Sequence, residues 1–296
     1  MKNATIGILS PGDMGHSVGA RLVENGLHVI YCSQGRSERT RSLAGEGGIA
    51  AVPSYQDLVT QADIILSILV PAAATAAARL VARALVATRA PLLYMDCNAI
   101  APQTAQEVGK IITTAGGRFQ DGCIIGGPPR GDYTPRIYTS GKESSAVVML
   151  NDFGLNVIPI SERVGDASAL KMCYASLTKG STALYVTLMS GARALGVLDP
   201  LLAEFRQSQQ SRLPGIENGI PRVTVKARRF VGEMEEMQKT YAGVGIDPNM
   251  FSGAAQIYRL MGETVLADRV PEDTSPFPSL VETLDILVAH MTPENE

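Results

Sequence analysis

Short apolar runs alternate with amphipathic stretches through the first half of the chain. An apolar run at 5–9 is followed by a polar turn, a helical stretch at 14–25 that stops at Gly26, and a second apolar run at 27–31. This order predicts a strand, a helix and a second strand. Such a unit pairs its two strands in parallel, with a right-handed crossover between them.

The same alternation continues as far as residue 125. The predicted helices cover 39–46, a stretch from 54, 72–87 and a stretch from 102, and the predicted strands cover 49–52, 62–70, 92–96 and 118–125. The run at 62–70 is almost continuously apolar, which is typical of a strand buried on both faces of a parallel sheet. We therefore predict an α/β fold with a doubly wound parallel sheet in this half.

Beyond residue 164 the pattern changes to long helical stretches with few strand signals. The predicted helices span 167–195, 222–244, 248–266 and 278–290, whereas 207–221 is polar, contains Gly and Pro, and is expected to form a loop. We therefore expect two domains, an α/β domain at 1–162 and an all-α domain at 163–296.

Composition narrows the class of protein. With 45% hydrophobic residues, 19% charged residues and a net charge of -3, the chain lacks the broad basic surface of a nucleic-acid binder. It contains neither an apolar stretch of the ~20 residues that span a membrane nor the apolar core of a signal peptide. The four cysteines and three histidines are too scattered to predict a zinc site or a disulfide framework. We expect a soluble cytoplasmic protein with a small-molecule substrate, no metal, and neither nucleic acid nor membrane as a partner.

A glycine-rich turn between the first strand and the first helix carries the clearest functional motif. Gly12 and Gly15 match the second and third glycines of the G-x-G-x-x-G dinucleotide-binding turn, and Ser10 replaces the first. Glycines here let the backbone approach a pyrophosphate, while the helix N-terminus supplies N–H groups. The residues expected to bind the cofactor at this turn are Ser10, Pro11, Gly12, Asp13, Met14 and Gly15. Residues 1–162 are thus predicted to be a Rossmann-type domain.

The loop after the second strand indicates which dinucleotide is bound. An acidic side chain here would bind the ribose 2′-hydroxyl of NAD, but residues 31–37 contain none. Hydroxyl and guanidinium groups in the loop suit a 2′-phosphate instead, with Arg39 assisting. The residues expected to bind it are Ser33, Gly35, Arg36 and Ser37. The sequence therefore predicts NADP(H) in preference to NAD(H).

Further blocks of sequence follow in an order that points to a known superfamily. Leu69-Val70-Pro71, 96–102, 121–127 and 165–171 resemble, in that order, segments of the β-hydroxyacid dehydrogenase and 6-phosphogluconate dehydrogenase superfamily. The resemblance covers residues 4–195, and the block at 227–237 is similar to a branch with its own C-terminal domain of unassigned function. The resemblance to the superfamily implies a homodimer in which the C-terminal helices of one chain help to close the active site of the partner.

The resemblance also implies roles for individual residues. Lys171 matches the catalytic lysine, and a partly desolvated lysine can deliver a proton to a developing alkoxide as a general acid or base. Leu69, Val70 and Asn98 are expected beside the nicotinamide half of the cofactor. The residues expected to bind substrate are Asn98, Ile125, Gly126, Gly127, Tyr174 and Thr178. At regular helical spacing Tyr174 and Thr178 share a face with Lys171, whereas Lys179 is turned about 80° away and is expected to have a structural or phosphate-binding role.

The chain departs from the superfamily pattern where small carboxylates are usually bound. Asn98-Ala99 stands for the usual Ser-Thr, Ile125 stands for a serine, and Tyr174 or Ala175 stands for the asparagine that follows the lysine. Because Ile125 and Cys123 cannot make strong hydrogen bonds, a bulkier or less polar substrate is expected.

Three functions remain open from the sequence. The first is an NADP-dependent dehydrogenase or reductase acting on a hydroxy or oxo compound. Another is an imine reductase, although such enzymes often replace the lysine that this chain retains. The last is a cofactor-binding sensor without catalysis.

Overall fold

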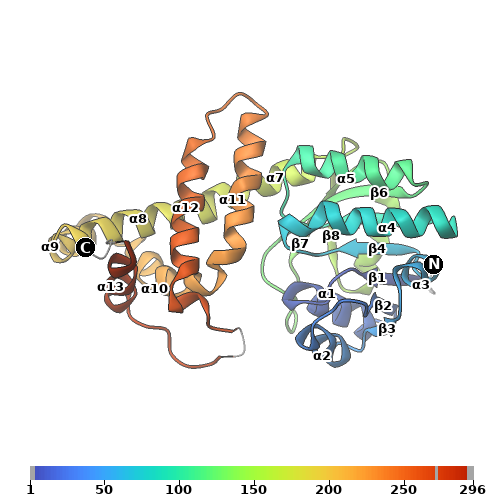
Figure 1. The fold of residues 1–296 in the computed structure, drawn as a ribbon, viewed down its shortest axis with the longest axis horizontal. Coiled ribbons are helices and arrows are strands. Elements are labelled where there is room, and N and C mark those ends of the chain that lie inside the picture. Colours follow the sequence, from blue (N-terminus) through green and yellow to red (C-terminus); the bar gives the residue numbers. More distant parts are fainter. Residues whose placement is uncertain (1–3, 271–272, 292–296) are drawn as a thin grey trace, which may run out of the picture. The chain divides into compact units, whose positions relative to one another are not determined.

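The computed structural model describes residues 4–270 and 273–291, and the chain divides into two compact units, Met1–Met172 and Cys173–Glu296 (Figure 1). This division falls later than the domain boundary expected at residue 162. The reason is that the first turn of the helix beginning at Asp166 is hydrogen-bonded to the sheet of the first unit.

The first unit is built on one sheet of eight strands in the order β3-β2-β1-β4-β5-β6-β7-β8. The strands are β1 Thr5–Ile8, β2 His28–Cys32, β3 Ala50–Val52, β4 Ile64–Ser67, β5 Leu93–Asp96, β6 Arg118–Ile125, β7 Arg136–Ser140 and β8 Asn156–Ser161. Every neighbouring pair is parallel except β6 and β7, which are antiparallel. The predicted α/β class with a doubly wound sheet is confirmed.

Helices cover both faces of this sheet, and each face has its own apolar core. The helices are α1 Asp13–Glu24, α2 Glu38–Glu46, α3 Tyr55–Gln61, α4 Ala74–Thr88, α5 Pro102–Thr114 and α6 Ser144–Val148, with 3-10 turns η1 Pro71–Ala73 and η2 Met149–Phe153. Residues of α1, α2 and α6 pack in one buried cluster, and residues of α3, α4 and α5 pack in the other. Strand β1 lies between β2 and β4, so the chain order reverses there. Ligands of open α/β sheets bind at the carboxyl ends of the strands beside such a reversal.

The described residues of the second unit form helices and connecting loops, with no strand among them, as expected. After α7 Asp166–Ala175, which begins in the first unit, come a π turn η3 Ser176–Gly180, α8 Ser181–Ala194, α9 Leu198–Ser208, α10 Leu213–Val223, the 3-10 turn η4 Thr224–Lys226, α11 Ala227–Ala242, α12 Asn249–Glu263, the 3-10 turn η5 Val265–Ala267 and α13 Leu280–Met291. Helices α11 and α12 pack side by side (Figure 1). Phe230 meets Tyr258 edge to face at 5.4 Å between ring centroids, and Tyr241 stacks on Phe251 at 4.9 Å.

Two expectations for this half were wrong. The segment 207–221 is not a loop, because α10 occupies Leu213–Val223 and buries Leu213, Ile216 and Ile220 at helical spacing. Pro214 lies in the first turn, where proline has no hydrogen bond to lose, whereas Pro221 lies inside the helix two residues before its end, so the backbone carbonyl of Glu217 loses its helical donor. The helix expected at 167–195 is interrupted by the π turn. This turn contains one more residue than a regular helical turn, so the side chains after it point in other directions than regular helical spacing predicts.

Candidate active site

The glycine turn at the end of β1 is shaped by two glycines with different surroundings. A Cβ on Gly15 would lie 2.2 Å from the carbonyl oxygen of Ser10, so only glycine lets α1 start this close to the turn. A Cβ on Gly12 would meet nothing within 4 Å, although Gly12 N donates to Ser10 O at 2.9 Å. The turn thus leaves open space at Gly12, where a bound phosphate would approach the backbone.

The N-terminus of α1 faces this space without a side-chain cap among the described residues. Gly12 is the N-cap, and no side-chain oxygen accepts from the first N–H groups of the helix. Uncapped N–H groups and the positive end of the helix dipole favour an anion. Asp13 in the first turn is paired with Arg39 at 2.6 Å, an exposed ion pair. The turn and helix therefore fit the pyrophosphate of a dinucleotide.

The loop after β2 brings the predicted phosphate-binding residues together at the start of α2. Arg36 Nη2 donates to the hydroxyl of Tyr55 at 3.0 Å, while Arg36 Nε is buried and has no hydrogen-bond partner in the described part of the chain. Burial raises the pKa of Tyr55, and the Arg36 guanidinium opposes that rise. Ser37 caps α2 by accepting from Thr40 N at 3.2 Å. Gly35 adopts a positive φ of 71°, so the loop can turn toward α2.

Asn98 follows β5, and its side chain is committed to the protein. It is 2% exposed, its Oδ1 accepts from Leu69 N at 2.5 Å, and its Nδ2 donates to Ser67 Oγ and Asp96 Oδ2, each at 2.9 Å. The amide thereby ties the ends of β4 and β5 together. These bonds let Asn98 place Leu69 and the adjacent Val70. Whether Asn98 also contacts cofactor or substrate stays a prediction.

Lys171 lies on α7 at the end of β6. Its Nζ donates to the carbonyl oxygen of Ile124 at 2.7 Å and is partly buried. Because β1, β4, β5 and β6 run parallel, the carboxyl end of β6 lies at the same edge of the sheet as the glycine turn. The candidate lysine and the candidate pyrophosphate site thus share one edge within the first unit.

The two residues of β6 that flank Ile124 have weakly polar or apolar side chains. Cys123 and Ile125, on either side of Ile124, are buried, and burial raises the pKa of the Cys123 thiol to about 12 although Lys171 opposes the rise. The next residue, Gly126, has a φ of +129°, and a Cβ there would lie 2.1 Å from the Tyr133 hydroxyl. Gly127 has open space where a Cβ would stand.

Tyr174 and Thr178 belong to the second unit and lie around the π turn. The Tyr174 side chain is 45% exposed, and the Thr178 hydroxyl donates to the backbone carbonyl of Ala175 at 3.4 Å. Since the π turn begins at Ser176, the regular spacing that placed Thr178 on the face of Lys171 does not hold. Whether either residue contacts substrate stays a prediction.

Lys179, also in the π turn, is held by the second unit. Its Nζ lies 2.9 Å from Glu233 Oε2 and 4.9 Å from the centroid of the Phe230 ring, and its backbone carbonyl accepts from the Tyr258 hydroxyl at 2.8 Å. These contacts attach the π turn to α11 and α12. Of the two roles expected for Lys179, they favour the structural one.

One buried polar group beside the site was missed from sequence. Asp121 lies within β6, opposite Asp96 of β5 in the register of the sheet, and is fully buried. The signal that could have found it is a carboxylate in the interior of a predicted strand, because a buried charge needs hydrogen-bond partners.

No group of three or more His, Cys, Asp or Glu residues that could hold a metal ion occurs in residues 4–270 and 273–291. Over the same residues, no helix is both long and apolar enough to cross a membrane.

A doubly wound sheet with a glycine turn at its point of reversal is the architecture of a dinucleotide-binding domain. Residues 5–153 match the NAD-binding domain of 6-phosphogluconate dehydrogenase, and the chain belongs to that family, as its sequence blocks predict. Residues 192–261 match a domain of unknown function, DUF1932. The protein is therefore an NAD(P)-dependent oxidoreductase by family.

Solved structures of similar proteins extend over nearly the whole chain. A conserved protein of unknown function, described as structurally similar to 3-hydroxyacid dehydrogenases, is 28% identical with a TM-score of 0.66, covering 88% of this chain and 97% of its own. A 3-hydroxyisobutyrate dehydrogenase from Mycobacterium tuberculosis, solved with L-serine, is 19% identical with a TM-score of 0.65, covering 88% and 94%. An imine reductase variant from Myxococcus stipitatus, in complex with NAD+, is 18% identical with a TM-score of 0.56, covering 99% and 100%. At the last two identities the likeness concerns the fold.

Proposed function

We propose that this protein is an NADP-dependent oxidoreductase that transfers a hydride between the nicotinamide and a hydroxy or oxo substrate, with Lys171 as the general acid or base. The observation that carries the proposal is the position of Lys171 Nζ, 2.7 Å from Ile124 O at the carboxyl end of β6. That end of the strand belongs to the same sheet edge as the glycine turn.

Lys171 has one task in this reaction. The nicotinamide, when bound, gives or takes the hydride. Reduction of a carbonyl leaves negative charge on its oxygen, and an ammonium group beside that oxygen stabilises the charge and supplies the proton. The Ile124 carbonyl orients Lys171 Nζ by accepting one of its N–H groups. In the oxidising direction the neutral amine takes the proton back.

The other side chains near Lys171 argue for a weakly polar substrate. Cys123 and Ile125 are buried, and the raised pKa of Cys123 keeps its thiol uncharged near neutral pH. The amide of Asn98 is bonded within the protein. We therefore infer that the substrate presents an apolar group to this part of the site and a single carbonyl or hydroxyl oxygen to Lys171.

The preference for NADP rests on the loop after β2. Arg36 has a buried Nε that lacks an acceptor within the described residues, and Arg39 and Arg41 follow in the first turn of α2. A ribose 2′-phosphate carries negative charge that these guanidinium groups can match, whereas a ribose hydroxyl carries none.

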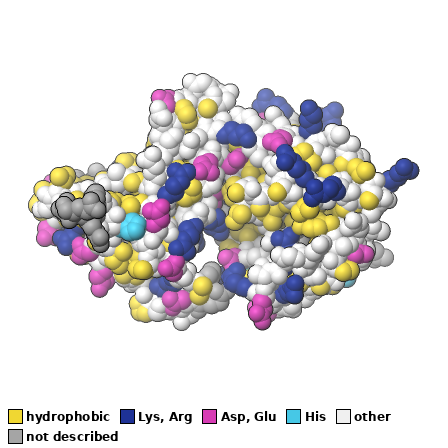
Figure 2. Space-filling view, viewed as in Figure 1, with side chains coloured by type: hydrophobic (Ala, Val, Ile, Leu, Met, Phe, Trp, Pro, Cys, Tyr) yellow, Lys and Arg dark blue, Asp and Glu magenta, His cyan; other side chains and the backbone are white. Residues whose placement is uncertain are grey.

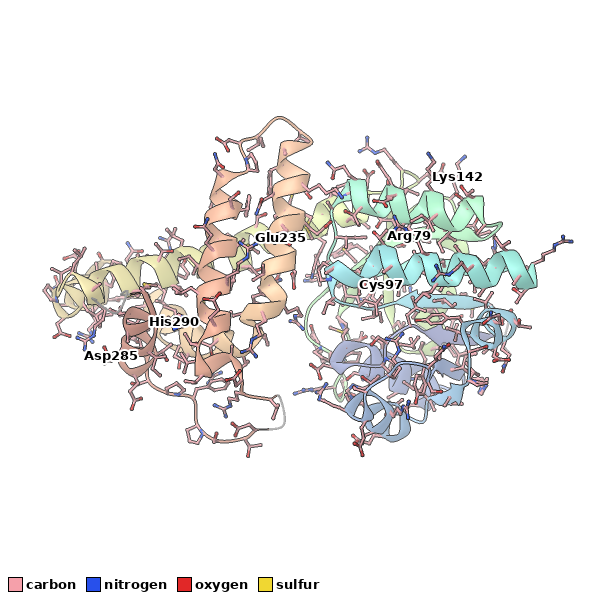
Figure 3. The ribbon with its side chains drawn as sticks, in the orientation of Figure 1. Arg79, Cys97, Lys142, Glu235, Asp285 and His290 are labelled. Atoms are coloured by element: carbon pink, nitrogen blue, oxygen red, sulfur yellow. The ribbon has the colours of Figure 1, made fainter. Side chains whose placement is uncertain are left out.

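The Lys171→Ala variant tests the proposed catalytic role. We expect wild-type protein to oxidise NADPH in the presence of at least one aldehyde or keto acid, and the variant to lose roughly two to four orders of magnitude in kcat, the usual effect of removing a general acid. The Kd for NADPH should be unchanged. Lys142→Ala is the matched control, because Lys142 is an exposed lysine of the same unit (Figure 3).

Three other results would decide against this function. Equal kcat for Lys171→Ala and wild type would remove the lysine from the chemistry. Turnover of cyclic imines alone would favour an imine reductase, the alternative supported by the apolar surroundings of Lys171 and by the shared fold. Tight NADPH binding with no turnover of aldehydes, keto acids or imines would favour a sensor.

A further inference from the structure

Asp121 is a buried carboxylate that the proposed chemistry does not use. Its side chain is fully buried in β6 and accepts four hydrogen bonds. Oδ2 accepts from Ser140 Oγ at 2.9 Å, from Gly165 N at 3.0 Å and from Ser168 N at 3.1 Å, and Oδ1 accepts from Ser168 Oγ at 2.7 Å. Burial raises the pKa of Asp121, and the hydrogen bonds from Ser168, Ser140 and Gly165 oppose that rise.

Three of these bonds come from the start of α7. Gly165 precedes the helix and Ser168 lies in its first turn, so a strand residue caps the helix in place of a local side chain. The positive end of the helix dipole favours a carboxylate at this point. Ser140 strengthens the same junction, because its Oγ also accepts from Ala167 N at 2.9 Å.

Lys171 is held to the same strand one turn further along. It follows Ser168 by three residues, and side chains at that spacing lie on neighbouring positions of one helix face. Its Nζ donates to Ile124 O, three residues beyond Asp121 in β6. The first turn and the lysine of α7 are thus attached to two points of one strand, and rotation of the helix would break both attachments.

We propose that Asp121 is the positioning residue for Lys171: by capping α7 it fixes the place of Nζ at the end of β6. This inference rests on the proposed function for its effect on catalysis. A displacement of about 1 Å in a catalytic group can lower the rate roughly 100-fold, so a carboxylate that holds the helix in register controls the reaction without touching the substrate.

The test compares Asp121→Asn with Asp166→Asn. Both substitutions are isosteric and remove a carboxylate from the N-terminus of α7, but Asp166 is bonded to Arg163 and Ser161 at the surface and not to β6. We expect Asp121→Asn to lower kcat roughly 10- to 100-fold, with unchanged KM for the substrate and unchanged Kd for NADPH. Asp166→Asn should keep the wild-type kcat.

A second measurement does not depend on turnover. The rate at which N-hydroxysuccinimidyl acetate acetylates Lys171 can be followed by peptide mass spectrometry, with the exposed Lys142 as an internal reference. If Asp121 positions the lysine, the Lys171 amine should react several times faster in Asp121→Asn than in wild type, and at the wild-type rate in Asp166→Asn.

These measurements separate the two proposals. Unchanged Lys171 acetylation in a folded Asp121→Asn protein, or equal changes in both variants, would overturn the positioning role even if wild type is active. A wild type without turnover would overturn the proposed function, while acetylation would still test Asp121. If Asp121→Asn does not fold, Ser168→Ala replaces it, because that change removes only the 2.7 Å bond to Oδ1 and should accelerate acetylation in the same direction.

Discussion

At the scale of single residues, the clearest prediction concerns Arg36 and the choice of cofactor. Its guanidinium lies in the loop after β2 and donates through Nη2 to the Tyr55 hydroxyl. A hydrogen bond to a charged group such as a 2′-phosphate contributes about 1.5–3 kcal/mol. We therefore expect Arg36→Ala to weaken NADPH binding roughly 10- to 100-fold, which corresponds to about 1.4–2.8 kcal/mol, and to leave NADH binding nearly unchanged.

Arg79→Ala is the control for this measurement. Arg79 is an exposed arginine on α4 (Figure 3), paired with Glu107 at 3.4 Å, so its removal changes the net charge equally without altering the β2 loop. Isothermal titration with both dinucleotides gives the ratio of the two Kd values. An equal loss of NADPH and NADH affinity in Arg36→Ala would mean that Arg36 only supports the loop through its bond to Tyr55.

The sequence indicates which polar residues lie near the site, but it does not indicate which groups their side chains bond to. The sequence places Asn98 directly after a strand and predicts a ligand contact, which stays a prediction, but it does not indicate the bonds of its amide to Leu69, Ser67 and Asp96. Asp121 belongs to the block at 121–127, but its role depends on Gly165 and Ser168, more than forty residues away. Spacing along a chain does not reveal such long-range partners.

At the scale of elements, the strand-turn-helix at the N-terminus provides a matched pair of glycine substitutions. In Gly15→Ala the new methyl group would clash with the Ser10 carbonyl at 2.2 Å, so we expect a lower free energy of unfolding for the apo protein. In Gly12→Ala the methyl group enters open space, so stability should stay near that of wild type. NADPH binding should nevertheless be lost, because the methyl group occupies the approach of the pyrophosphate.

Urea denaturation of the apo proteins and titration with NADPH distinguish these effects. The informative variant is Gly12→Ala, because it is expected to abolish NADPH binding without lowering the free energy of unfolding. If it binds NADPH like wild type, the space at Gly12 is not where the pyrophosphate lies. If Gly15→Ala is as stable as wild type, the turn adapts more readily than its geometry indicates.

Most elements of the first unit follow from periodicity, and the exceptions have physical causes. Strands buried on both faces are continuous apolar runs, which is why β4 was recognised. Strands β7 and β8 were not predicted, because both have exposed positions and β8 contains Pro159, a residue tolerated on an edge strand. The π turn was also missed, since residues 176–180 carry no proline or other sequence marker of a changed helical period.

At the scale of the whole molecule, exposed apolar side chains are distributed unequally between the two units. Among the described residues, the exposed large apolar side chains of Met1–Met172 are Val70, Val86, Tyr133 and Ile160. The other thirteen belong to the shorter unit Cys173–Glu296. On the face shown in Figure 2, apolar side chains lie between charged ones of both signs. Apolar side chains concentrated at a surface are typical of a protein interface.

We propose that the second unit forms the interface of a homodimer, with α8 as its central element. Leu184 lies in α8, and Leu195 is the residue directly after the helix. They are 55% and 79% exposed and eleven residues apart, so at helical spacing they lie on nearly the same side. Charged residues at both positions should disfavour burial of about 800 Å² per partner, the area typical of a stable interface. We therefore expect wild-type protein to sediment as a dimer and Leu184→Glu/Leu195→Glu as a folded monomer.

The control for this change is Val86→Glu, because Val86 is 66% exposed but lies on α4 of the first unit. Sedimentation velocity at several protein concentrations measures the mass of each variant, and circular dichroism checks that each is folded. Dissociation only in the α8 variant would support the interface, and NADPH titration of that monomer would then ask whether the first unit binds its cofactor alone. A monomeric wild type, or a dimer that persists in the double variant, would mean that the exposed side chains of α8 have another role than dimerisation.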